Sequence, residues 1–300
     1  MAIPLEGIFP ALWTPTNENG ELLAEEFKSN LEFILNSGAH GSMALGSTGE
    51  FIHLRTPERK KILEKVVELS GNKPVIANIS HIRPADVFDL GRHARAAGAY
   101  AVALLPPWFY PLSPDDLAEF YARAGQAAQL PMVLYNFPEL TGKKLELETI
   151  RRIDDLFPIA GIKQSGAEFG YHAPLVQLGR ERDFVVLTGY DTRIAEAMEI
   201  GVTGCIGGLG NVAPELMAEI FSAVAAGVPA RAALATERMA ELGRRIGGIT
   251  FPLNIAAAME ARGLKPGVPK AVVSAETRKQ CRQLTGELRE LFQEWKLSVF

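Results

Sequence analysis

The feature that most constrains the fold is an alternation of short apolar runs with longer amphipathic stretches, which continues to about residue 225. The runs are apolar at nearly every position, as expected of parallel strands that are buried on both faces. About eight are present: Gly7–Leu12, Gly41–Gly46, Pro74–Ile79, Ala101–Leu105, Met132–Tyr135, Ile159–Lys163, Phe184–Thr188 and Gly204–Gly207.

The stretches between these runs have the signatures of helices. Leu22–Asn36 carries apolar residues at helical spacing and is followed by Gly38 as a stop signal. Thr56 and Ser113 each precede a proline, which predicts an N-cap followed by proline at the first helical position. Eight strand–helix units predict a TIM barrel over residues 1–225. An open doubly wound sheet is the alternative, disfavoured because no long polar linker separates two halves.

Beyond residue 225 the pattern becomes purely helical. Three segments rich in helix formers follow one another, Arg231–Ile246, Leu253–Arg262 and Ala275–Trp295. They predict a helical extension over residues 226–300 that packs on the barrel.

Composition excludes several classes of function. The net charge of −4 and the lack of a Lys/Arg block argue against nucleic acid as a partner. Cys205 and Cys281 make no disulfide framework, so we expect a reducing, cytoplasmic setting. No signal peptide is visible, and no apolar stretch approaches the roughly 18 residues needed to span a membrane. None of the five histidines forms an HExxH pair, so we expect no metal.

Lys163 is the most informative single residue, because it ends the sixth apolar run at the edge of a small-residue turn. Lysine is rarely buried. Burial favours the neutral amine, a nucleophile that forms a Schiff base with a carbonyl substrate. A strand-end lysine with its head in water is the alternative, and this segment alone does not decide between the two.

Other reactive side chains follow the predicted strands, and the carboxyl ends of barrel strands meet at one face. Gly46–Gly49 offers backbone N–H groups and two hydroxyls as a cradle for a carboxylate, although an ordinary turn also fits. Tyr135 can move a proton, or can be a core tyrosine. Gly208–Ala213 loosely matches a dinucleotide fingerprint, but it follows the last strand, so we expect no nucleotide cofactor.

Three motifs in this order and spacing resemble the dihydrodipicolinate synthase and N-acetylneuraminate lyase superfamily. They are Gly46-Ser47-Thr48-Gly49-Glu50, Tyr135-Asn136-Phe137-Pro138 and Gly161-Ile162-Lys163. The resemblance covers essentially the whole chain. It implies a class I aldolase or dehydratase on a TIM barrel, without cofactor, that forms a Schiff base with pyruvate or another 2-oxo acid. It also implies a homotetramer, arranged as a dimer of dimers.

The resemblance implies roles for individual residues. Lys163 is the Schiff-base nucleophile, Tyr135 the general acid/base, and Ser47 its proton relay. Thr48 in the turn that starts at Gly46 holds the substrate carboxylate. The backbone of Ile206 touches pyruvate, and Tyr110 enters the site of a neighbouring subunit.

Departures from the family pattern bear on the substrate. Leu140 replaces an arginine with which dihydrodipicolinate synthases bind the carboxylate of aspartate semialdehyde. Leucine cannot bind a carboxylate in that way, which disfavours lysine biosynthesis. Sialic acid lyases have Gly-Tyr-Asp-Glu where this chain has Gly189-Tyr190-Asp191-Thr192. The partial match suggests another polyhydroxy substrate, with Glu139, Asp191 and Thr192 as hydroxyl ligands and Trp108 and Phe109 narrowing the mouth.

The leading hypothesis is a lyase that cleaves or forms a 2-keto-3-deoxy sugar acid from pyruvate and an aldehyde. A 2-keto-3-deoxy acid dehydratase is the runner-up with the same imine. A non-catalytic ligand-binding homologue and a metal-dependent barrel hydrolase are the alternatives from other classes. The first is opposed by the intact Lys163, Tyr135 and Ser47, and the second by the lack of a metal motif.

Overall fold

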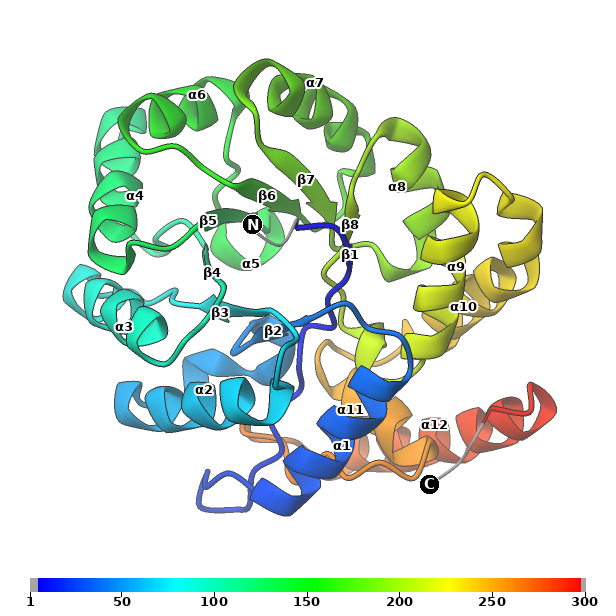
Figure 1. Cartoon of the computed structure of the whole chain (residues 1–300). Helices are drawn as coiled ribbons and strands as arrows, with labels where there is room; N and C mark the ends of the chain where they lie inside the picture. Colours follow the sequence, from blue (N-terminus) through cyan, green and yellow to red (C-terminus); the bar gives the residue numbers. More distant parts are fainter. Residues whose placement is uncertain (1–4, 298–300) are drawn as a thin grey trace.

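The computed structural model describes residues 5–297, which form a (β/α)8 barrel with helices around a parallel sheet (Figure 1). All strand pairs are parallel, in the order β1-β8-β7-β6-β5-β4-β3-β2. The remaining gap is closed by backbone hydrogen bonds from Leu12 to Met43 and from Met43 to Pro10, each 2.9 Å. The predicted TIM barrel is therefore confirmed.

The strands are shorter than the apolar runs, except β5, which extends one residue further. They are β1 (Gly7–Ile8), β2 (Ser42–Ala44), β3 (Val75–Asn78), β4 (Ala101–Leu104), β5 (Met132–Asn136), β6 (Gly161–Gln164), β7 (Val185–Thr188) and β8 (Gly204–Cys205). The predicted first strand, Gly7–Leu12, is wrong beyond Ile8. Pro10 has no N–H to donate to a sheet, so the chain continues with only an isolated bridge from Ala11 to Met43.

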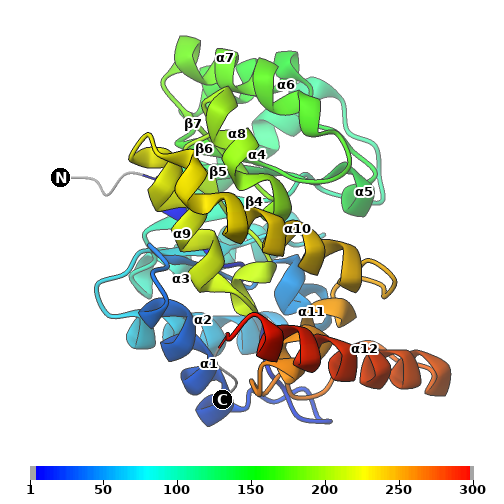
Figure 2. The ribbon, with the colours of Figure 1, turned by 90° about the vertical axis from the view of Figure 1, so that its right-hand side faces the viewer.

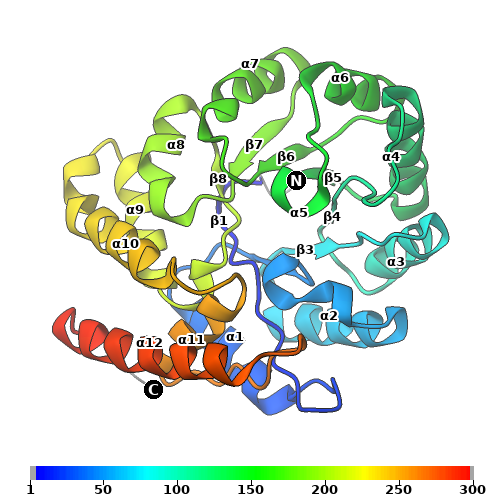
Figure 3. The ribbon, with the colours of Figure 1, turned by 180° about the vertical axis from the view of Figure 1, so that it is seen from behind.

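Helices follow the strands around the barrel. They are α1 (Ala24–Asn36), α2 (Thr56–Ser70), α3 (Pro84–Ala96), α4 (Pro114–Ala128), α5 (Pro138–Thr141), α6 (Leu147–Leu156), α7 (His172–Arg182), α8 (Ile194–Ile200) and α9 (Pro214–Ala225). Because α5 directly follows β5, it marks the carboxyl end of the barrel, which faces the viewer in Figure 3.

One of the two predicted N-caps is confirmed and the other is wrong. The Ser113 hydroxyl accepts a hydrogen bond from the Asp116 N–H at 3.1 Å and caps α4. The cap of α2 is Arg55 rather than Thr56. The Glu58 carboxylate accepts from the Arg55 N–H at 2.8 Å, and this bond lets the helix begin one residue earlier.

The C-terminal helices α10 (Ala233–Ile246), α11 (Leu253–Ala261) and α12 (Ala275–Glu294) lie on one side of the barrel (Figure 2). A short 3₁₀ turn, Pro229–Ala232, precedes α10, so that helix begins two residues later than predicted. The apolar cluster beneath these helices also contains Ile8, Cys205 and Met217 from the barrel. The extension therefore shares one core with the β1–β8 side. A domain boundary after residue 225 stays a prediction.

Candidate active site

Lys163 and Tyr135 lie side by side at the carboxyl end of the barrel. They are register partners on β6 and β5, so the parallel pairing directs both side chains the same way. Only 4% of Lys163 and 2% of Tyr135 is exposed. The lysine Nζ lies 4.0 Å from the centre of the tyrosine ring. A buried amine thus stands next to a buried phenol, and the water-exposed alternative for Lys163 is wrong.

The hydroxyl of Ser47 extends this pair. Ser47 Oγ and Tyr135 Oη are 3.2 Å apart, within hydrogen-bonding distance. Ser47 starts the 3₁₀ turn η1 (Ser47–Gly49), which follows β2 and contains the buried Thr48. Gly46 enters this turn in extended conformation, with ψ at −173°. The site therefore contains a row of three neighbouring groups: the amine of Lys163, the phenol of Tyr135 and the hydroxyl of Ser47.

A cavity of about 390 Å³ opens above Lys163. The expected site residues Thr48, Tyr135, Asp191, Thr192 and Ile206 line it together with Lys163. Gly46, Ser47, Glu139 and Tyr110 are not part of its wall. Ser165, Phe251 and Asn254, which sequence reasoning missed, complete it. Ser165 lies two residues after Lys163, a spacing that does signal the same face of a strand. Phe251 and Asn254 carried no such signal.

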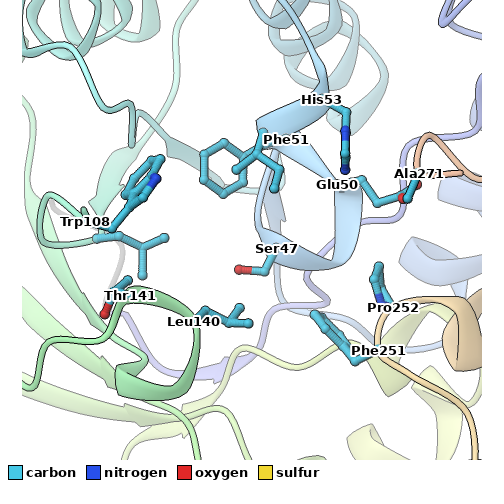
Figure 4. Close-up of a pocket in the computed structure, with 12 residues that line it drawn as sticks. Ser47, Glu50, Phe51, His53, Trp108, Leu140, Thr141, Phe251, Pro252 and Ala271 are labelled. Atoms are coloured by element: carbon cyan, nitrogen blue, oxygen red, sulfur yellow. The ribbon is translucent and has the colours of Figure 1, made fainter.

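A second hollow of about 310 Å³ adjoins the first at Phe251, which lines both. Figure 4 shows the Ser47 hydroxyl pointing into it, with Phe51, Trp108 and Leu140 around it. Trp108 narrows this mouth as expected, packed edge-to-face against Phe51 at 6.2 Å. Phe109 does not: it is 79% exposed and lines neither hollow. The Ser47 hydroxyl thus lies at the second hollow, within hydrogen-bonding distance of Tyr135, which lines the cavity above Lys163.

Asp191 is held by the backbone at the end of β8. Its carboxylate accepts a hydrogen bond from the Leu209 N–H at 3.0 Å, and Cys205 Sγ lies 3.7 Å away. Burial raises the pKa of Asp191 to about 6, while the Leu209 hydrogen bond and the charge of Lys163 oppose this rise. A carboxylate with these partners fixes the loop after β8, and its role as a hydroxyl ligand stays a prediction.

The carboxylate of Glu139, like that of Asp191, already accepts a hydrogen bond from the backbone. Its carboxylate accepts from the Ala167 N–H at 2.5 Å and lies against Gly166, whose φ is +98°. It thereby joins the loop after Tyr135 to the loop after Lys163. The neighbouring Tyr190 has its pKa raised to about 12, first by burial and then by the charge of Glu139.

Tyr110 lies apart from both hollows. It is 71% exposed and packs edge-to-face on Phe109, with the ring centres 4.9 Å apart. Phe109 takes a φ of +86°, unusual for a bulky residue. Two large aromatic side chains are thus presented to solvent from the loop after β4. The entry of Tyr110 into a neighbouring site stays a prediction.

The described residues offer neither a metal site nor a membrane-spanning helix. Within residues 5–297, no cluster of three His, Cys, Asp or Glu side chains has the geometry to hold a metal ion. In the same range, no helix combines the length and apolarity that crossing a bilayer requires.

A buried lysine beside a tyrosine at the carboxyl end of a (β/α)8 barrel is the arrangement expected of a barrel lyase of the aldolase type. Comparison with known proteins places the chain in a family of such lyases. The chain belongs to the Dihydrodipicolinate synthetase family, whose model matches residues 4–287. The resemblance inferred from the three motifs is therefore confirmed, and the protein is a lyase of that family.

Individual relatives carry different names. A 4-hydroxy-tetrahydrodipicolinate synthase of Methanothrix thermoacetophila is 30% identical over 95% of this chain and 97% of its own. A "Probable 2-dehydro-3-deoxy-D-pentonate aldolase" of Escherichia coli K12 is 30% identical over 79% of this chain and 80% of its own. A prophage protein of the same family from E. coli K12, solved in complex with pyruvate, superposes with a TM-score of 0.89. It is 25% identical and covers 98% of this chain and 99% of its own. Equal identity to a synthase and an aldolase leaves the substrate open.

Proposed function

We propose that this lyase forms a Schiff base between Lys163 and the keto group of pyruvate or another 2-oxo acid. The observation that carries the proposal is the buried amine 4.0 Å from the Tyr135 ring, with the Tyr135 hydroxyl 3.2 Å from Ser47. The complex of a full-length structural relative with pyruvate supports this choice of ligand. The η1 turn with Thr48 is the element suited to the substrate carboxylate.

The reaction follows from these groups. Lys163 Nζ attacks the C2 carbonyl of the long substrate, Tyr135 gives its phenol proton to the departing hydroxyl, and water leaves behind a protonated imine. The resulting Tyr135 phenolate takes the proton of the C4 hydroxyl, the C3–C4 bond breaks, and the imine accepts the electron pair as an enamine. The aldehyde departs, Tyr135 returns this proton to C3 of the enamine, and water releases pyruvate from Lys163. Ser47 passes protons between Tyr135 and the second hollow, which Ser47 lines.

The charge of the two hollows favours a neutral aldehyde. Among the described residues that line them, Lys163 is the only lysine or arginine, and the imine uses it. Leu140, 51% exposed, stands at the second hollow without a donor for an anion. An anionic aldehyde would lose hydration there without gaining a lysine or arginine as counter-charge. We therefore favour a 2-keto-3-deoxy sugar acid, whose aldehyde half is neutral and hydroxylated. Polar groups that can bind its hydroxyls are offered by Ser165, Thr192 and Asn254.

Three alternatives remain within the same pocket. A 2-keto-3-deoxy acid dehydratase uses the same imine to expel a hydroxyl, and only the aldolase releases pyruvate. Dihydrodipicolinate synthesis, the activity in the name of one relative, is disfavoured by Leu140. A non-catalytic ligand-binding homologue predicts that Lys163→Ala binds its ligand as well as the parent does.

The assembly is a separate proposal. We propose a homotetramer built as a dimer of dimers, supported by the exposed Phe109 and Tyr110. Analytical ultracentrifugation measures the mass of the particle. A monomer at working concentration would contradict this assembly and the role of Tyr110 with it.

The test of the imine is borohydride trapping. The protein is incubated with pyruvate and borohydride, digested, and analysed by peptide mass spectrometry. We expect a reduced pyruvyl adduct on Lys163, absent without borohydride and absent in Lys163→Ala. A folded parent protein that gives no adduct sinks the proposal. With the adduct in hand, pyruvate release from 2-keto-3-deoxy sugar acids separates the aldolase from the dehydratase.

A further inference from the structure

A buried ion pair lies under the η1 turn and joins it to the C-terminal segment. Glu50 and Lys270 are 220 residues apart in sequence, with side chains only 3% and 4% exposed. Lys270 Nζ lies 3.3 Å from Glu50 Oε2, and the Lys270 backbone N–H donates to the same oxygen at 3.2 Å. In Figure 4 the Glu50 side chain extends towards Ala271, the residue after Lys270.

Lys270 also holds a third segment. Its Nζ donates to the Thr14 carbonyl at 2.6 Å and lies 5.3 Å from the centre of the Trp13 ring. The indole N–H of Trp13 in turn donates to the Pro266 carbonyl at 2.6 Å. One ammonium group therefore connects the chain after β1, the η1 turn and the segment between α11 and α12.

Glu50 connects the Lys270 ion pair directly to the η1 turn. It follows Gly49 directly, takes a left-handed φ of +53°, and its N–H donates to the Ser47 carbonyl at 3.1 Å. On the other side, a Cβ on Gly49 would lie 2.8 Å from Thr14 Oγ1. The turn that carries Ser47 and Thr48 is thus fixed at its end by a charged side chain.

Stability alone gives a weak reason for such a pair. Desolvation of two charges can exceed their attraction, and an apolar pair of similar volume often stabilises a fold as well. Burial lowers the pKa of Lys270, which is the signature of that cost, and the charge of Glu50 opposes the change. The Glu50–Lys270 pair instead fixes the positions of the two segments that it joins.

We infer that Glu50 and Lys270 are positioning residues, which hold the Ser47–Thr48 turn in the geometry that receives the carboxylate of the 2-oxo acid. The inference rests on the proposed imine chemistry. It makes the C-terminal segment part of the active site although Lys270 does not line the cavity above Lys163. A displacement of about 1 Å in a substrate-positioning group can cost on the order of 10²-fold in rate.

The test compares Lys270→Met, Lys270→Arg and the double variant Glu50→Gln/Lys270→Met. Lys265→Met is the matched control, because Lys265 lies in the same segment with an exposed side chain. For Lys270→Met we expect the KM for pyruvate, measured by imine trapping and by turnover, to rise about 10- to 100-fold. The adduct yield on Lys163 at saturating pyruvate stays at the parental level. Lys270→Arg recovers most of the loss, and Lys265→Met has the parental KM.

The double variant separates positioning from stability. Without an orphaned charge it is expected to unfold at a higher temperature than Lys270→Met, yet to keep the raised KM. A folded double variant with the parental KM overturns the inference, and it decides the matter if Lys270→Met fails to fold. A parent protein that forms no adduct refutes the proposed function instead, so the two failures are distinguishable.

Discussion

Removal of one hydroxyl, in Tyr135→Phe, tests the proton-transfer role of Tyr135. The phenyl ring can keep its place against Lys163, whose Nζ lies 4.0 Å from the ring centre. What is lost is the hydroxyl 3.2 Å from Ser47 Oγ. The variant therefore removes the proton path while it leaves the amine and its packing in place.

The expected loss follows from the size of general acid–base catalysis, which contributes about 10²- to 10⁴-fold. At 1.36 kcal/mol per tenfold, this is about 3–5 kcal/mol of barrier. The effect on folding is smaller, since one hydrogen bond contributes about 1 kcal/mol. We expect kcat for aldehyde release to fall by about 10²-fold or more in a protein that remains folded.

The assay combines turnover with borohydride trapping on the same preparation. We expect slower imine formation but the same final adduct yield on Lys163 with pyruvate. Tyr121→Phe is the matched control, because it removes another buried tyrosine hydroxyl, which donates to the Leu104 carbonyl at 3.2 Å. That variant is expected to lose about 1 kcal/mol of stability and to keep its kcat.

Parental kcat in Tyr135→Phe would refute the proposed role of the hydroxyl. Equal losses in the two variants would also refute it, because the loss would then reflect a general effect of removing a buried hydroxyl. An adduct yield that falls in proportion to kcat would show that the variant loses the imine itself, and not the bond cleavage that follows it.

Three further predictions follow from the site. Leu140→Arg, at the second hollow, is expected to raise kcat/KM for an anionic aldehyde by about 10-fold or more relative to a neutral one. The reason is that a hydrogen bond to a charged group contributes about 1.5–3 kcal/mol. An unchanged ratio of the two kcat/KM values would show that the aldehyde does not pass this hollow. Because the pKa of Asp191 is raised to about 6 from a usual value near 4, folding favours its protonated form. The stability from this group is thus present below about pH 4 and lost as pH rises through about 6, and Asp191→Asn should flatten that slope in urea unfolding at a series of pH values. Dialysis against a chelator is expected to leave turnover unchanged, and a loss that a divalent metal restores would favour the metal-dependent alternative.

The barrel and the catalytic pair follow from local properties of the chain. Continuous apolar runs between helical stretches predict parallel strands buried on both faces, and chain order predicts their neighbours. Tyr135 and Lys163 each lie one residue before the end of neighbouring strands, so the pairing of β5 with β6 was enough to bring them together. The carboxyl end of β1 and the cap of α2 differ from the sequence prediction, because one depends on closure around Pro10 and the other on a single side chain, Glu58.

The partners of the polar groups were decided only by the tertiary structure. Asp191 and Glu139, expected as hydroxyl ligands, accept from the backbone of Leu209 and Ala167, and Lys270 meets Glu50 across 220 residues. Periodicity records which face of an element is apolar. It carries no information on which distant N–H or carbonyl will satisfy a buried charge, since that depends on how loops from separate units meet. The sequence by itself determined the barrel and the place of Lys163 beside Tyr135, and the packing of the loops decided what holds them in place.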